Sequence, residues 1–109
     1  MEKKTLKSRV LYILEKYPFT RNDDLVLTLY LWREFYPSKI QRDENNKAYI
    51  FVEDIKLLPR EDHIKRVRAN IQNKENKFLP TDINVVKARK LNEEIWREKM
   101  RFNDEYRRL

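Results

Sequence analysis

The stretch LPREDHIKRVRANIQNK, Leu58–Lys74, places a basic run behind a proline turn. Its apolar residues Ile64, Val67 and Ile71 recur at every third or fourth position. This spacing puts them on one face of an α-helix, so it predicts a helix over Glu61–Asn73 with that face buried. The basic side chains then occupy the opposite face, which is either a solvated surface or one that lies on phosphates.

Helical patterns interrupted by prolines also precede this stretch. An apolar stripe predicts a first helix over residues 5–17, which Pro18 ends because the residue before a proline is pushed out of the α region. Residues 25–36 are apolar nearly all round and predict a central buried helix that stops at Pro37. We therefore expect a mainly α chain.

A short helix and a short strand complete the pattern around the basic helix. Residues 51–58 predict a short helix with Ile55 and Leu58 pointing inward. The apolar run 48–52 before it is either a strand or the entry to that helix. Residues 78–79 predict a short return strand, which would be a minimal β wing.

One long helix is expected after Pro80, with Thr81 or Asp82 as its cap. Its expected contacts with the rest of the protein are Val86, Leu91, Ile95 and Met100. The aromatic residues farther along the helix extend beyond what a small core can cover, so they indicate a surface for a second copy or another protein. That candidate partner interface consists of Trp96, Met100, Phe102 and Tyr106.

The composition excludes several classes of function. With 109 residues, 40% of them hydrophobic, the chain forms one small domain with a modest core. It has no glycine and no cysteine, which excludes glycine-rich phosphate loops, disulfides and cysteine nucleophiles. The chain has one histidine and two serines, which are too few ligands for a zinc site and too few candidate residues for a serine triad. We therefore expect neither an enzyme nor a metal or cofactor, and no apolar run approaches the roughly 20 residues that span a membrane.

The positive charge is concentrated in one part of the chain. The formal net charge is +7. Residues 64–90 carry eight basic and two acidic side chains, a net of +6, whereas residues 1–59 carry eleven and nine, a net of +2. A local basic region of this kind favours a nucleic-acid partner more strongly than the total charge does.

A short helix, a proline turn and a basic helix form a helix-turn-helix pattern, whose second helix enters the major groove of DNA. The predicted fold is a winged helix-turn-helix with a minimal β wing over residues 1–80, followed by a C-terminal helix over residues 81–109 that packs on it or on a partner. The predicted function is duplex DNA binding, although basic charge alone does not exclude RNA.

Burial of the apolar stripe would turn the DNA-contacting side chains outward. Arg66, Asn70 and Asn73 are expected at base edges, because Arg forks onto guanine and Asn pairs with adenine. Lys65, Arg68, Lys74 and Lys77 are expected at phosphates, with Arg68 and Gln72 on the flanks of the helix. The complete expected set is Arg60, His63, Lys65, Arg66, Arg68, Asn70, Asn73, Lys74 and Lys77.

LPREDHIKRVRANIQNKENKFLPT together with VVKARKLNEEIWRE resembles small phage and prophage proteins of the winged helix-turn-helix type. The matching residues are Leu58, Pro59, Ile64, Arg66, Arg68, Ile71, Gln72, Leu79, Pro80 and Thr81, and the likeness covers about residues 10–100. The resemblance implies the winged helix-turn-helix fold more than any named process. The process that we expect the protein to serve is transcriptional control or replication of a phage or mobile element, in the cytoplasm. Ala69 and Asn70 depart from the pattern, since a further basic residue often stands there.

A second interpretation belongs to another class of function. The chain could be a phage-encoded protein-interaction module that inhibits a nucleic-acid machine of the host. Its basic face would then meet an acidic protein surface, and its last helix would be the docking element. Loss of function at Arg66 and Arg68 would favour DNA binding, whereas loss at Trp96 and Phe102 would favour docking.

Overall fold

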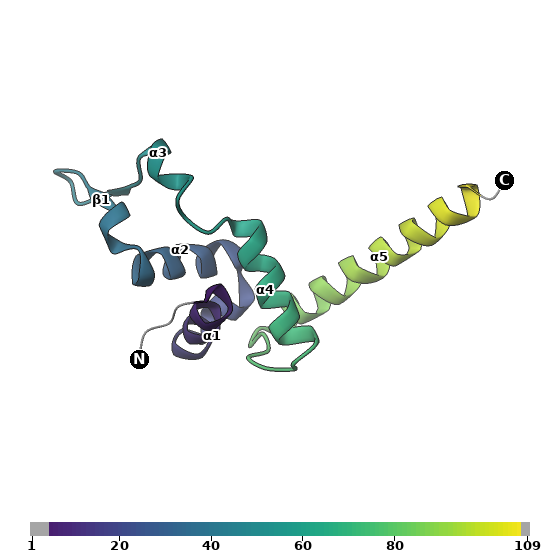
Figure 1. Cartoon of the computed structure of the whole chain (residues 1–109). Helices are drawn as coiled ribbons and strands as arrows, with labels where there is room; N and C mark the ends of the chain where they lie inside the picture. The colour runs from purple at the N-terminus through teal and green to yellow at the C-terminus, as the bar shows by residue number, and fades with distance from the viewer. Residues whose placement is uncertain (1–4, 108–109) are drawn as a thin grey trace.

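The computed structural model describes residues 5–107, with side chains through residue 99. In this range the chain is mainly helical, with one small antiparallel sheet, so the predicted mainly α class is confirmed (Figure 1). The elements are α1 (Leu6–Lys16), the 3₁₀ helix η1 (Pro18–Asn22), α2 (Asp24–Phe35), the 3₁₀ helix η2 (Pro37–Lys39), β1 (Gln41–Arg42), β2 (Ala48–Tyr49), α3 (Val52–Ile55), α4 (Glu61–Asn73) and α5 (Ile83–Arg107).

Side-chain caps and prolines set the ends of the first helices. Thr5 caps α1, because its hydroxyl accepts a hydrogen bond from the Ser8 backbone N–H at 3.1 Å while the Ser8 hydroxyl accepts one from the Thr5 N–H at 3.2 Å. Asp23 caps α2 by accepting from the N–H of Leu25 at 2.9 Å. Both helices end just before a proline, as predicted.

The core lies between α1, α2 and α4, which pack against one another. Its fully buried apolar side chains are Val10, Ile13, Leu14, Leu27, Leu31, Ile64 and Ile71. Val67 is half-buried against this core, so the predicted apolar stripe of α4 faces inward. Each buried side chain of this kind contributes about 1.5–3 kcal/mol, which anchors α4 by its inner face.

The predicted central helix α2 supplies core residues, but it is buried along one side only. Leu27 and Leu31 are buried, but Leu25 and Leu29 are 53% and 49% exposed. A domain of this size has too few elements to surround a helix. The outer side of α2 borders an open apolar pocket of about 410 Å³, which Leu29 lines together with residues of the β1–β2 hairpin.

α3 is much shorter than the predicted helix over residues 51–58. It makes a single turn, and none of its residues is buried. Ile55 is 45% exposed, contrary to prediction, whereas Leu58 in the following turn is 4% exposed and faces inward as expected. One turn is too short to present an apolar stripe, so α3 does not brace α4 with a buried face.

The only strands in the described range lie before α3, and the predicted wing at residues 78–79 is wrong. β1 and β2 pair antiparallel, with Gln41 opposite Tyr49. The apolar run 48–52 therefore supplies both β2 and the cap of α3. Phe78 has a φ of 48°, a left-handed conformation that ends any strand, and its ring packs toward the core.

α5 begins at a side-chain cap and then leaves the body of the protein (Figure 1). Asp82 caps it by accepting from the Asn84 N–H at 2.9 Å, which confirms one of the two predicted caps. The expected contacts Val86, Leu91 and Ile95 are 39%, 56% and 43% exposed, so that prediction is wrong. The molecule measures 60 × 29 × 28 Å, because the helix points outward instead of along the core.

Candidate nucleic-acid interface

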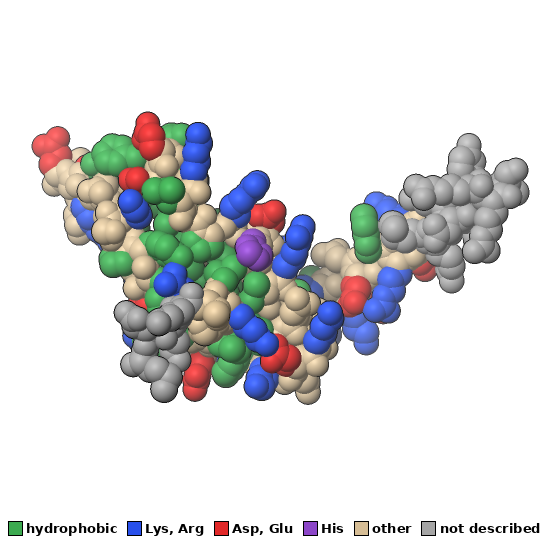
Figure 2. Space-filling view, viewed as in Figure 1, with side chains coloured by type: hydrophobic (Ala, Val, Ile, Leu, Met, Phe, Trp, Pro, Cys, Tyr) green, Lys and Arg blue, Asp and Glu red, His purple; other side chains and the backbone are tan. Residues whose placement is uncertain are grey.

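The outer face of α4 carries most of the residues predicted to contact DNA. Lys65, Arg66, Asn70 and Asn73 are all exposed, as the burial pattern of the helix predicted. Beyond the first turn, which contains Glu61 and Asp62, the exposed positions of α4 carry no acidic side chain. Basic side chains gather over α4 and the beginning of α5 (Figure 2).

Three further predicted residues flank this face at the two ends of α4. Arg60 precedes the helix, and its side chain is 84% exposed with its Nε 3.7 Å from Asp62 Oδ1. Lys74 and Lys77 follow the helix in the connection to α5, and both are exposed. The Lys77 N–H donates to the Ile71 carbonyl at 3.1 Å, which holds this connection close to the end of α4. His63 is exposed in the first turn.

Arg68 does not belong to the exposed face, so its predicted phosphate contact is wrong. It is 5% exposed. Its Nε and Nη2 donate to the two carboxylate oxygens of Asp24, each at 2.8 Å. A bidentate pair of this geometry fixes the guanidinium inside the molecule, between α4 and the start of α2. Arg68 is therefore a positioning residue for α4.

Gln72 is also buried, at 4% exposure, and not on a solvated flank. Its Nε2 donates to the Phe78 carbonyl at 2.8 Å, which holds the strained connection after α4. Its Oε1 accepts from Arg68 Nη1 at 3.4 Å and from Arg89 Nη1 at 3.3 Å. The spacing in the sequence indicates this burial, because Arg68 and Gln72 occupy the i+4 and i+8 positions of the same stripe that begins at Ile64.

Arg89 on α5 contributes to this region but was absent from the predicted set. Its Nη1 donates to the Arg21 carbonyl at 3.0 Å as well as to Gln72. Its pKa is lowered, first because burial removes water from the guanidinium and second because the charge of Arg68 is close, while Asp24 opposes this shift. Only the local concentration of charge over residues 64–90 pointed to it in the sequence.

Asn22 locks the start of α5 onto η1. Its Oδ1 accepts from the backbone N–H groups of Thr81 and Asp82 at 3.0 and 3.1 Å, and its Nδ2 donates to the Thr81 hydroxyl at 2.9 Å. These bonds join residues about 60 positions apart in the chain. No pattern in the sequence indicates such a pairing, which depends on how the helices pack.

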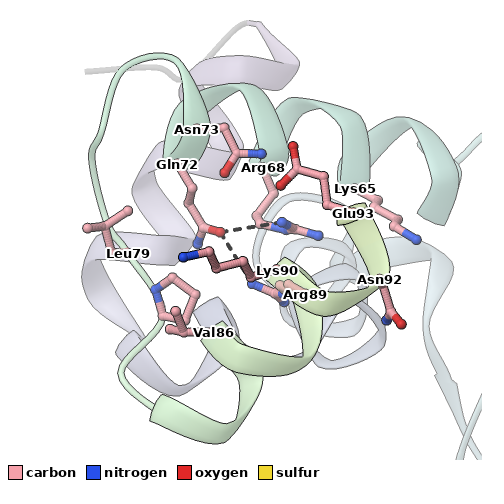
Figure 3. A pocket seen from close by; sticks show the side chains of 11 residues that line it. Lys65, Arg68, Gln72, Asn73, Leu79, Val86, Arg89, Lys90, Asn92 and Glu93 are labelled. Carbon is pink, nitrogen blue, oxygen red and sulfur yellow. Dashed lines mark hydrogen bonds between the residues drawn. The ribbon is translucent and has the colours of Figure 1, made fainter. Parts of the chain in front are cut away.

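A cleft of about 490 Å³ separates α4 from the first turns of α5 (Figure 3). Its lining comes from both helices and the connection between them: Lys65, Arg68, Gln72, Asn73, Leu79, Pro80, Val86, Arg89, Lys90, Asn92 and Glu93. Arg68 and Arg89 approach each other from opposite helices at the Gln72 side chain (Figure 3). The cleft adjoins the outer face of α4, because Lys65 and Asn73 belong to both.

The candidate partner interface on α5 is described only in part. Trp96 is 63% exposed, and the side chains of Met100, Phe102 and Tyr106 lie outside the described residues. None of the described helices combines the length and apolar character that a membrane crossing requires. Over the same residues, no three acidic or histidine side chains gather as metal ligands.

A scan against protein-family models, a search of curated proteins and a search of solved structures each found no match for this chain. The winged helix-turn-helix resemblance therefore remains an expectation from the sequence. Any function assigned to the protein depends on the geometry of α4, the connection after it and the start of α5.

Proposed function

We propose that this protein binds duplex DNA through the exposed face of α4. The observation that supports it is the division of this helix into two faces. Ile64 and Ile71 anchor one face in the core, while the other face presents basic and amide side chains with no acid beyond the first turn. A rigidly held helix with such a surface suits the major groove of DNA.

The side chains on that face divide into two roles. Arg66, Asn70 and Asn73 are spaced i, i+4 and i+7 and therefore form one line along the helix, which suits base edges in a groove. Lys65, Lys74 and Lys77 lie beside this line or beyond its end, where they would contact phosphates. Arg68 supports these contacts by holding α4 against Asp24.

In this proposal α4 is the recognition helix, and α1 and α2 support it in place of the short α3. The β1–β2 hairpin lies before the turn and not after α4, so no DNA contact is assigned to it. Transcriptional control or replication of a phage or mobile element would be the process served.

The test is fluorescence anisotropy of a labelled duplex of random sequence, titrated at several salt concentrations. We expect binding that weakens steeply as salt rises, because counterions are released from neutralised phosphates. Arg66→Gln should weaken binding, whereas Arg33→Gln, the same change at an exposed position of α2, should leave it nearly unchanged. A folded protein that binds no duplex even at low salt would rule out the proposal.

A protein-docking function is the second candidate, and the exposed apolar residues of α5 favour it. Leu91, Ile95 and Trp96 are 56%, 43% and 63% exposed on a helix that leaves the core. An apolar surface on a projecting helix is typical of a partner interface. This candidate is compatible with DNA binding, since α5 beyond its first turns lies away from α4 (Figure 1).

A further inference from the structure

The cleft between α4 and α5 holds more positive charge than its own acids neutralise. Of its cations, Arg68 is paired with Asp24 behind the cleft. Its one lining acid, Glu93, pairs with Arg97 at 2.9 Å. Among the described residues, Lys65, Arg89 and Lys90 form no ion pair with any carboxylate.

Arg89 is the most constrained of these three cations. Bonds from Nη1 to the Arg21 carbonyl and to Gln72 orient its guanidinium, and the side chain is partly withdrawn from water. Its pKa is lowered by the same burial and by the nearby charge of Arg68, although Asp24 and Asp23 oppose the shift. A cation that has lost water and has no acidic partner gains most from an anionic ligand.

We propose that this cleft binds a phosphate group, held by Lys65 from α4 and by Arg89 and Lys90 from α5. Amide groups of Asn73 and Asn92 line the same cleft and can donate further hydrogen bonds (Figure 3). Several donors of this kind around one space match the oxygens of a phosphate better than those of a single carboxylate.

This inference rests on the proposed function and adds a second helix to it. Lys65 belongs both to the cleft and to the outer face of α4, so a DNA strand that crosses α4 would bring a backbone phosphate to the mouth of the cleft. α5 would then contact DNA through its first turns, although no residue of α5 was among the DNA contacts expected from the sequence. A free phosphate or a nucleotide has the same chemistry and is the other source of the ligand.

The test follows the ¹⁵N-labelled protein by NMR, through its backbone amides and the Nε–H of Arg89. Inorganic phosphate should shift signals of Lys65, Arg89 and Lys90 saturably, while chloride at equal ionic strength should not. Lys90→Gln should weaken phosphate binding several-fold. Lys87→Gln makes the same change on α5 outside the cleft lining and should leave binding unchanged. Unaltered signals elsewhere show that both variants are folded.

A short duplex then distinguishes the sources of the phosphate and separates the inference from the proposed function. A backbone phosphate in the cleft is supported if the duplex displaces inorganic phosphate. In that case Lys90→Gln should also reduce the slope of log duplex affinity against log salt by about 0.9. Binding of phosphate or a nucleoside triphosphate there, without duplex binding, supports the site and refutes the proposed function. The inference is overturned if none of these ligands shifts the NMR signals of the cleft residues. This holds even if the duplex shifts the signals of residues on the outer face of α4.

Discussion

Arg68 acts as a clamp between two helices, because its guanidinium meets Asp24 inside the molecule. Only 7% of its side chain and 16% of that of Asp24 are exposed. Moving two charges out of water offsets much of their mutual attraction, so such a pair adds little net stability compared with apolar residues of the same size. We expect its main effect to be the placement of α4 relative to α2, and therefore the direction in which the outer face points.

Removal of one partner of this pair should be strongly destabilising. Arg68→Ala leaves the largely covered carboxylate of Asp24 without its partner, and we expect a loss of about 3–5 kcal/mol in the free energy of unfolding. Chemical denaturation monitored by circular dichroism measures this loss. Arg66→Ala, on the exposed face of the same helix, should change stability by no more than about 0.5 kcal/mol. Equal effects of the two substitutions would contradict the assignment of Arg68 to the interior.

At the scale of elements, α5 differs from the other helices because little of its part with described side chains is covered. Its start is tied to the body by Asn22 and Arg89, but residues 90–99 are all exposed. The Glu93–Arg97 pair at i, i+4 contributes only about 0.2–0.5 kcal/mol to a helix. A helix without tertiary packing is marginal in water, so the outer part of α5 depends on whatever covers it.

Hydrogen exchange distinguishes an uncovered α5 from a covered one. At low protein concentration, amides after residue 92 should exchange far faster than those of α1, α2 and α4, because local opening there exposes no core. If two copies associate through α5, their protection should rise with concentration, and Trp96→Ala should abolish that rise. Sedimentation at the same concentrations provides the independent check. Core-like protection in a dilute monomer would show instead that α5 packs on its own domain.

Over the whole molecule, the charge is distributed so that one side attracts anions. The net of +6 over residues 64–90 comes from two helices and the connection between them, which fold next to each other. The net of +2 over residues 1–59 is spread over the remaining elements. A field of this kind raises the rate of encounter with nucleic acid and makes affinity depend on salt.

The salt dependence of duplex binding should identify the phosphate contacts one at a time. Lys65→Gln and Lys77→Gln should each reduce the slope of log affinity against log salt by about 0.9, because each variant releases fewer counterions. Lys47→Gln removes the same charge from the connection between β1 and β2 and should leave the slope unchanged. The measurement is the anisotropy titration repeated from low to moderate salt. Identical slopes for all three variants would mean that only total charge matters and that α4 forms no defined interface.

The bounds of α4 and the direction of its apolar stripe could be predicted, because both depend on local properties of the chain. A proline turn before the helix and apolar residues at helical spacing act within a few residues of each other. The same local logic correctly placed the first two helices, and it named Asp82 as one of two candidate caps of α5. The prediction of a wing strand at residues 78–79 failed. The left-handed conformation of Phe78 is held by a hydrogen bond from the Gln72 side chain and by packing against the core.

The sequence by itself therefore determines the helix positions, the caps and the basic character of one region. Each of these features depends on residues that are close to one another along the chain. The spacing also places Arg68 on the stripe that begins at Ile64 and Arg66 away from it. The partner of Arg68 does not follow from the spacing, because Asp24 lies forty-four residues away in the chain. That pairing arises only when α2 and α4 pack together, because the low water content between them makes a charge there stable only beside its partner.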